Sequence, residues 1–173
     1  MNNQIKINAL GRKIGGTCIR SGFSFTRGSV DFPKFPATKD EMVDYLETLG
    51  LTLTTSTYDR FYALTTFDCW KDVIAEDVVK TIQYVPEYFD CDNFAFAFAS
   101  FAAALYGLTS ALPCYGEMVG VGRHYFNIIV TKENGLFNAY LYEPITGKYA
   151  KIEKDKPMVV AGNTYIAQHI HLF

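Results

Sequence analysis

The sequence predicts an α+β domain in which helices come first and antiparallel strands follow. Between residue 37 and about the middle of the chain, apolar residues recur at helical spacing, whereas strand-like runs fill the second half. Asn134-Gly135 joins two of these runs as a hairpin. The 173 residues are enough for one domain with a genuine core, and the 14 Phe and 12 Tyr side chains favour a compact fold over disorder.

The charge distribution divides the chain into two parts. We expect residues 1–36 to form a basic N-terminal arm or short strands, and residues 37–173 to form the α+β domain. The first part carries six basic side chains and one acidic one, whereas residues 37–100 carry four basic and twelve acidic ones. The arm would therefore dock on the acidic middle of its own chain or meet an acidic partner. No feature of the sequence fixes an oligomeric state.

Composition argues against several classes of protein. The formal net charge of −2 does not indicate binding to nucleic acid or to a membrane surface. The longest apolar stretch, 94–107, is too short to span a bilayer, and the first residues lack the apolar region of a secretory signal. The four cysteines show no CxxC spacing, which argues against structural zinc and indicates free thiols in a reducing, cytoplasmic compartment.

Two helices are predicted before residue 83. The first begins at Thr38, a suitable N-cap, with Glu41 at the capping-box spacing, and Gly50 ends it. The second covers 68–82, where apolar residues recur at helical spacing, and we expect a break near Glu76-Asp77.

A third helix is predicted from Asp90 to Tyr106, with Gly107 ending it. Its Phe-Ala alternation is typical of a strand, but its length and its alanine content favour a helix. Because apolar residues surround this helix on all sides, we expect it to be central and buried.

Antiparallel strands are predicted after a Gly-rich loop over 116–122. Residues 124–131 and 137–143 form the hairpin around Asn134-Gly135, and with a two-residue turn the paired positions sum to 269. Two further strands are expected, over 148–152 and 164–172.

This register places a histidine beside a carboxylate. His124 and Glu143 become diagonal neighbours on one face of the hairpin, with Cα atoms about 7–8 Å apart. The other residues of that face are apolar, while the opposite face is more polar. A histidine held by a carboxylate is the base and its orienting group in nucleophilic catalysis.

Cys91 completes the candidate site. It falls in the first turn of the third helix, where the helix dipole favours a negative sulfur. Asp90 and Asp92 act against the thiolate because their charge is also negative. The thiol therefore requires a cation, either a protonated His124 or a metal ion held by the two aspartates. A lone cysteine in such a helix is commonly a packing residue, so it is the combination with His124 and Glu143 that predicts a reactive group.

Three motifs resemble those of a known family. They are Asp-Cys-Asp-Asn-Phe-Ala at 90–95, His-Tyr-Phe-Asn at 124–127 and Tyr-Glu-Pro-Ile-Thr-Gly at 142–147. They are similar to the motifs of the papain-like cysteine protease domain of certain fungal agglutinins, the mushroom lectin proteases, and of related uncharacterised bacterial and phage domains. Asn93 stands where an acidic residue is common in that family.

The resemblance implies a papain-like fold and a role for each residue. Cys91 would be the nucleophile, His124 the general base and acid, and Glu143 its orienting group. Calcium dependence in that family makes Asp90 and Asp92 candidate metal ligands. No cofactor is otherwise required, and a phage-encoded protein in a host cell is the alternative to an ordinary cytoplasmic one.

The predicted function is a cysteine hydrolase that cleaves an amide bond in a peptide or a peptidoglycan-like substrate, with neither nucleic acid nor membrane as a partner. By analogy with papain-like enzymes, Gln83 would add a donor to the oxyanion hole, although a solvated helix glutamine is an equally good interpretation. Two alternatives stay open. One is a non-enzymatic binding or structural module on the same scaffold, and the other is a cysteine acyltransferase.

Overall fold

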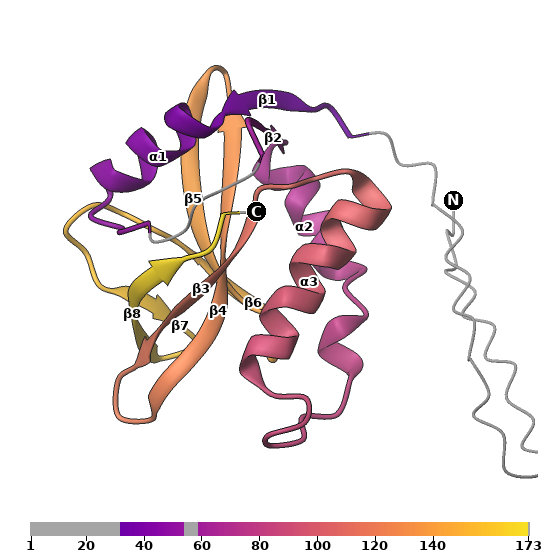
Figure 1. The fold of residues 1–173 in the computed structure, drawn as a ribbon, viewed down its shortest axis with the longest axis vertical. Helices are drawn as coiled ribbons and strands as arrows, with labels where there is room; N and C mark the ends of the chain where they lie inside the picture. The colour runs from indigo at the N-terminus through magenta and orange to yellow at the C-terminus, as the bar shows by residue number, and fades with distance from the viewer. Residues whose placement is uncertain (1–31, 54–58, 173) are drawn as a thin grey trace, which may run out of the picture. The chain divides into compact units, whose positions relative to one another are not determined.

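The computed structural model describes residues 32–53 and 59–172, so most of the expected basic arm lies outside the described residues. The elements in chain order are β1 (Phe35–Thr38), α1 (Lys39–Thr48), β2 (Phe61–Leu64), α2 (Phe67–Ala75), the short 3-10 helix η1 (Val79–Thr81), α3 (Cys91–Tyr106), β3 (Ala111–Met118), β4 (Gly122–Glu133), β5 (Leu136–Glu143), β6 (Lys148–Lys151), β7 (Met158–Val160) and β8 (Asn163–Ile170) (Figure 1). In this part of the chain, no helix is both long enough and apolar enough to cross a lipid bilayer.

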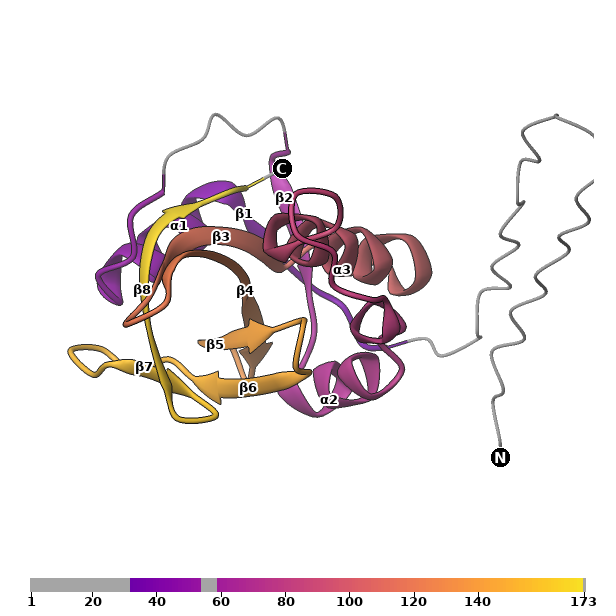
Figure 2. The same ribbon diagram turned by 90° about the horizontal axis from the view of Figure 1, so that it is seen from below.

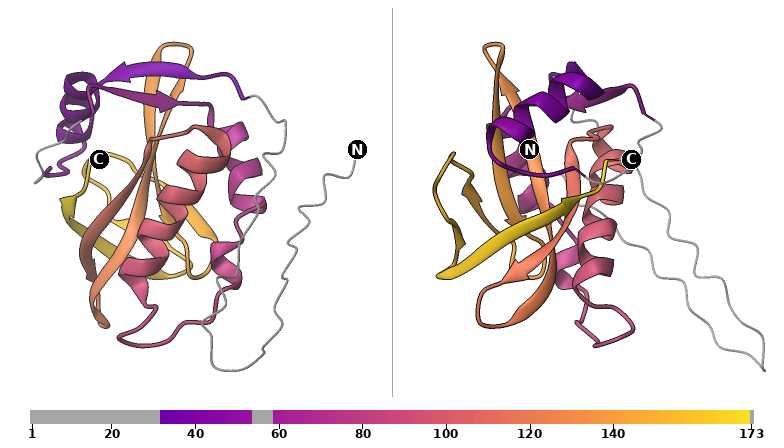
Figure 3. Two further views of the ribbon diagram at one scale, coloured as in Figure 1. Left: turned by 45° about the vertical axis from the view of Figure 1, so that its right-hand side comes forward. Right: turned by 60° about the vertical axis from the view of Figure 1, so that its left-hand side comes forward.

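Six of the strands form one antiparallel sheet in the order β6-β5-β4-β3-β8-β7. The sheet curls until its two edge strands, β6 and β7, come close to each other, which gives a nearly closed barrel (Figure 2). Strands β1 and β2 form a separate two-stranded sheet, and together with α1 they lie at one end of the curled sheet (Figure 3).

The fold class expected from the sequence, a papain-like α+β fold with a central helix, is therefore wrong. The described chain is mostly antiparallel sheet, and α3 packs beside that sheet (Figure 1). One part of the error lies at β3 (Ala111–Met118), since we expected its last residues to belong to a Gly-rich loop. Pro113 and Gly116 interrupt the alternation of this strand, and both residue types are rare inside strands.

The helix boundaries follow the local capping signals, as predicted. Thr38 Oγ1 accepts a hydrogen bond from Glu41 N at 3.2 Å, and Glu41 Oε2 accepts one from Thr38 N at 2.7 Å. Helix α2 stops at Ala75, which confirms the expected break. Helix α3 begins at Cys91 and ends before Gly107, whose φ of 64° lies in the left-handed region.

The β4–β5 hairpin has the predicted register. Asn134 and Gly135 have φ values of 51° and 79°, as a two-residue turn with left-handed residues requires. The pairing extends as far as Asn127 and Tyr142, so paired positions sum to 269.

One face of this hairpin belongs to the main core. Its side chains lie in a fully buried cluster to which α1 contributes Met42 and Leu46, and to which β4 and β5 contribute Phe126, Ile128, Val130, Ala139 and Leu141. This is the apolar face expected from the sequence.

The opposite face, which we expected to be the more polar one, is also buried, because α3 covers it. The rings of Phe98 and Tyr142 lie 4.3 Å apart between centroids. Asn127 Nδ2 donates to the Ala95 carbonyl at 3.0 Å, and the Tyr142 hydroxyl donates to Asp77 Oδ2 at 2.6 Å. Burial raises the pKa of the Asp77 carboxyl. Polar side chains on this face thus bind the helical layer to the sheet.

Candidate functional site

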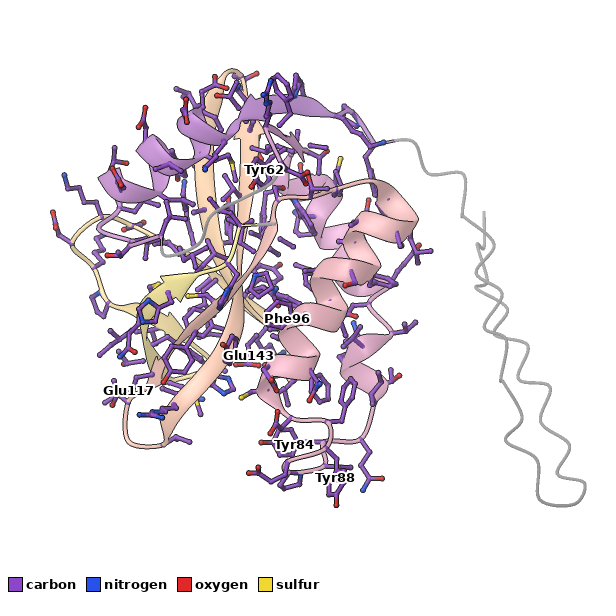
Figure 4. The ribbon with its side chains drawn as sticks, in the orientation of Figure 1. Tyr62, Tyr84, Tyr88, Phe96, Glu117 and Glu143 are labelled. Carbon is purple, nitrogen blue, oxygen red and sulfur yellow. The ribbon has the colours of Figure 1, made fainter. Side chains whose placement is uncertain are left out.

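The site forms where the β4–β5 pairing stops. The last residues paired are Asn127 and Tyr142, so His124 and Glu143 lie just beyond the ladder. The hydrogen bond from Asn127 to α3 holds the N-terminal half of that helix against this end of the sheet, which brings Cys91 to the same place. Figure 4 shows Glu143 beside the N-terminal half of α3.

Glu143 and His124 form a buried pair. Glu143 Oε2 lies 2.6 Å from His124 Nε2, and both residues are less than a tenth exposed. Glu143 Oε1 accepts a hydrogen bond from the backbone of Ile145 at 3.1 Å, and Oε2 accepts a second one from the Tyr165 hydroxyl at 3.2 Å. The carboxylate is therefore held by donors on both oxygens.

The Cys91 thiol also interacts with the His124 ring. Burial by itself lowers the pKa of this imidazole, but the hydrogen bonds and charges of Cys91 and Glu143 outweigh burial and raise the pKa of His124 to about 9. The ring is therefore cationic at neutral pH. Cys91 is a free, half-buried thiol.

Asp90 and Asp92, the expected calcium ligands, interact with each other and with the start of α3. A hydrogen bond between the two carboxyl groups raises the pKa of Asp92. Asp92 Oδ1 also accepts from Asn93 N at 2.8 Å. Within residues 32–53 and 59–172, no three His, Cys, Asp or Glu side chains form a group that could hold a metal ion. The hypothesis that Asp90 and Asp92 bind calcium is therefore wrong, since two carboxylates supply fewer oxygen ligands than the six or more that calcium usually has.

Gln83, the expected oxyanion donor, lies in an exposed segment after η1. In the described part of the chain, no hydrogen bond joins it to Cys91 or His124. Its neighbour Tyr84 packs on Phe94 of α3, with ring centroids 6.2 Å apart. The segment therefore borders the site through its aromatic residue.

A set of rings that we did not predict from the sequence lies on the surface beside Cys91. We call it the aromatic platform, and its members are Phe96, Tyr115, Tyr125, His169 and His171. Each of these residues is half-buried or exposed.

The platform is built on three neighbouring strands. Tyr115 of β3 is paired with Tyr125 of β4 on one side and with His169 of β8 on the other. The ring centroids in this row are 5.3 Å and 5.8 Å apart. Phe96 of α3 and His171 extend the row, with centroids 5.7 Å apart. The sequence does show an aromatic residue on each of these strands. It predicts the platform only when β3 is known to lie between β4 and β8.

The platform adjoins the acidic start of α3. Burial, and then the charge of Asp92, raise the pKa of the Tyr125 hydroxyl, and the Cys91 thiol adds to the effect. The aromatic rings, the two aspartates and the thiol therefore share one surface region.

Comparison with known proteins gave matches at the level of structure. No protein-family model matches the chain, and no curated protein matches it. A structure described as the PSL1a–E64 complex has a TM-score of 0.57 and 20% sequence identity, over 78% of this chain and 50% of that chain. A crystal structure of Polyporus squamosus lectin, bound to the human-type influenza-binding epitope Neu5Acα2-6Galβ1-4GlcNAc, has a TM-score of 0.53 and 21% identity, over 66% and 45% respectively.

The chain spans about half the length of these solved structures, and at such identity the likeness shows the fold alone. Neither structure is described as a papain-like protease, and one is a lectin bound to a trisaccharide. The resemblance to papain-like cysteine proteases is therefore withdrawn. The predicted cysteine hydrolase, its peptide or peptidoglycan-like substrate and a phage origin are withdrawn with it.

Proposed function

We propose that this chain is a non-enzymatic binding module whose ligand is a carbohydrate. The observation that carries the proposal is the aromatic platform beside Cys91. The likeness to a lectin supports it, but a shared fold does not specify a ligand. The ligand class therefore has to follow from the chemistry of the exposed side chains.

The platform suits a sugar ring. A pyranose has an apolar face made of C–H groups and an edge made of hydroxyls. Tyrosine presents a large, rigid apolar face at low cost in conformational entropy, and its hydroxyl serves as donor and acceptor. Tyr115, Tyr125 and His169 lie in a row fixed by direct strand pairing, so little ordering is needed before a ligand binds.

The acidic edge of the platform favours a carbohydrate over a nucleic acid. Asp90 and Asp92 supply oxygen acceptors for sugar hydroxyls at the start of α3. The same carboxylates would repel backbone phosphates, which nucleic-acid-binding surfaces attract with Lys and Arg.

Tyr125→Ala is expected to weaken carbohydrate binding by at least about tenfold, since a central aromatic residue commonly contributes 2 kcal/mol or more at a binding site. The main probes are neutral oligosaccharides, with the anionic trisaccharide Neu5Acα2-6Galβ1-4GlcNAc alongside them, titrated into the labelled protein and followed by NMR. Phe61→Ala is the matched control, because Phe61 is 65% exposed and lies on β2, outside the platform. Absence of saturable binding to every sugar, or equal weakening by both substitutions, would contradict the proposal.

We further propose that Cys91, His124 and Glu143 form a reactive thiol group at the edge of the platform. At neutral pH, iodoacetamide should label Cys91 at least about ten times faster than Cys69 and Cys114, because Cys91, of these three described cysteines, is the one beside an imidazolium. Burial raises the pKa of Cys114 to about 12, which makes it an internal reference for an inert thiol.

Peptide mapping after timed labelling gives the rate at each cysteine. His124→Gln should slow labelling of Cys91 and leave Cys69 unchanged. Equal rates at the described cysteines would contradict the reactive group.

Turnover tests the non-enzymatic part of the proposal. A panel of chromogenic esters and amides should be cleaved no faster by the wild-type protein than by Cys91→Ala, apart from one stoichiometric acylation. Repeated turnover that depends on Cys91 would overturn the binding-module proposal and support thiol chemistry as the function of the site.

A further inference from the structure

The Glu143 carboxylate receives three hydrogen bonds from three separate parts of the fold. His124 on β4 and the Tyr165 hydroxyl on β8 both approach Oε2, at 2.6 Å and 3.2 Å, and the backbone of Ile145 approaches Oε1 at 3.1 Å. His124 and Tyr165 share Glu143 Oε2 as their acceptor. The hydrogen bond from either group therefore reduces the negative charge on this oxygen that is left to interact with the other group.

Tyr165 is held in place independently of this contact. It is 4% exposed and is paired with Met118 on β3 and with Met158 on β7. Its ring lies edge-on to Phe126, with centroids 5.3 Å apart, and 6.0 Å from the His124 ring. The position of the hydroxyl is therefore set by the sheet.

We propose that Tyr165 is a positioning residue that holds the Glu143 carboxylate toward His124 and takes up part of its negative charge. Through Glu143, it limits how strongly the carboxylate stabilises the imidazolium next to Cys91. The inference rests on the geometry of the buried pair and does not depend on the identity of the ligand.

Among residues 32–53 and 59–172, few other groups face His124. Helix α3 contributes the Cys91 thiol, β5 contributes Glu143 and β8 contributes Tyr165. On β3, the residue paired with His124 is Gly116, which has no side chain to titrate. A change in the titration of His124 can therefore be traced to one of these three side chains.

The test is to titrate the histidines by NMR in Tyr165→Phe, which keeps the ring packing and removes the hydroxyl. The chain has three histidines, so the spectrum is simple, and His124→Gln assigns the resonance of interest. Without the Tyr165 hydroxyl, the Glu143 carboxylate should stabilise the protonated form of His124 more strongly. The pKa of His124 should therefore rise by about half a unit or more.

Tyr140→Phe is the matched control, because it removes a tyrosine hydroxyl on β5 whose neighbours are Phe67 and Tyr45 instead of the buried pair. His169 and His171 act as internal references and should titrate as in the wild-type protein. If Tyr165→Phe folds and leaves the pKa of His124 unchanged or lowered, Tyr165 is only a packing residue and the inference is overturned.

Discussion

Gly116→Ala is expected to prevent the chain from folding. A Cβ atom at this position would lie 2.1 Å from the carbonyl oxygen of Ile166 and 3.2 Å from the Cα of Ala167, both of which belong to the backbone of β8. No side-chain rotation relieves such a contact, so β8 would have to leave β3. Gly116 also adjoins the irregularity in the β3–β8 register, which lies between Tyr115 and Gly116.

The expected loss is more than about 4 kcal/mol, which is a large share of the stability of a typical domain. Far-UV circular dichroism and thermal unfolding measure it. Gly120→Ala is the control: a Cβ there meets open space and the backbone φ is 83°, so only a conformational strain of about 1 kcal/mol is expected. A cooperative transition near the wild-type Tm in Gly116→Ala would show that β8 can shift without loss of the sheet.

Glu143→Gln is expected to cost about 3 kcal/mol of stability near pH 6, because it leaves the buried, protonated His124 without its carboxylate. The size of this loss should depend on pH. The folded-state pKa of His124 is raised to about 9, above the value of about 6.5 in an unfolded chain. The stability that His124 contributes is therefore fully present below about pH 6.5, and it is lost as the pH rises through about 9.

Urea unfolding at about pH 6, 7.5 and 9.5 tests this dependence. The free-energy difference between the wild-type protein and Glu143→Gln should shrink as the pH rises, because the wild-type protein loses the stabilisation that the variant never had. Glu47→Gln on the exposed surface of α1 is the control and should leave the free energy of unfolding nearly unchanged at every pH. A loss of the same size at all three pH values would contradict a charged His124 in the folded state.

Local chemistry made part of this structure predictable. The start of α1 follows from the capping box between Thr38 and Glu41, two residues that are only three positions apart. The hairpin register follows from the turn at Asn134 and Gly135, and with it the contact between His124 and Glu143. In each of these cases the deciding interaction lies within about twenty residues.

The parts that were not predicted depend on distant partners. Asn127 and Tyr142 made one face of the hairpin look solvated, yet their acceptors lie 32 and 65 residues away, on Ala95 and Asp77. The aromatic platform and the bond from Tyr165 to Glu143 required the position of β8 in the sheet, which no local pattern reveals. The error in fold class has the same origin, since closure of the barrel is a property of all six strands.

The turn at Asn134–Gly135 lies at one end of the β4–β5 pairing, and the buried pair lies beyond its other end, at Asn127 and Tyr142. Side chains alternate along a strand, so a slip of one residue in the β4–β5 register would move Glu143 to the other side of the hairpin from His124. Insertions or deletions in this turn are therefore compatible with the site only where they leave the pairing of Asn127 with Tyr142 unchanged, either as added loop residues or with a compensating bulge. Natural variation in this loop, or a peptide grafted into it, would be limited by residues that the loop never touches.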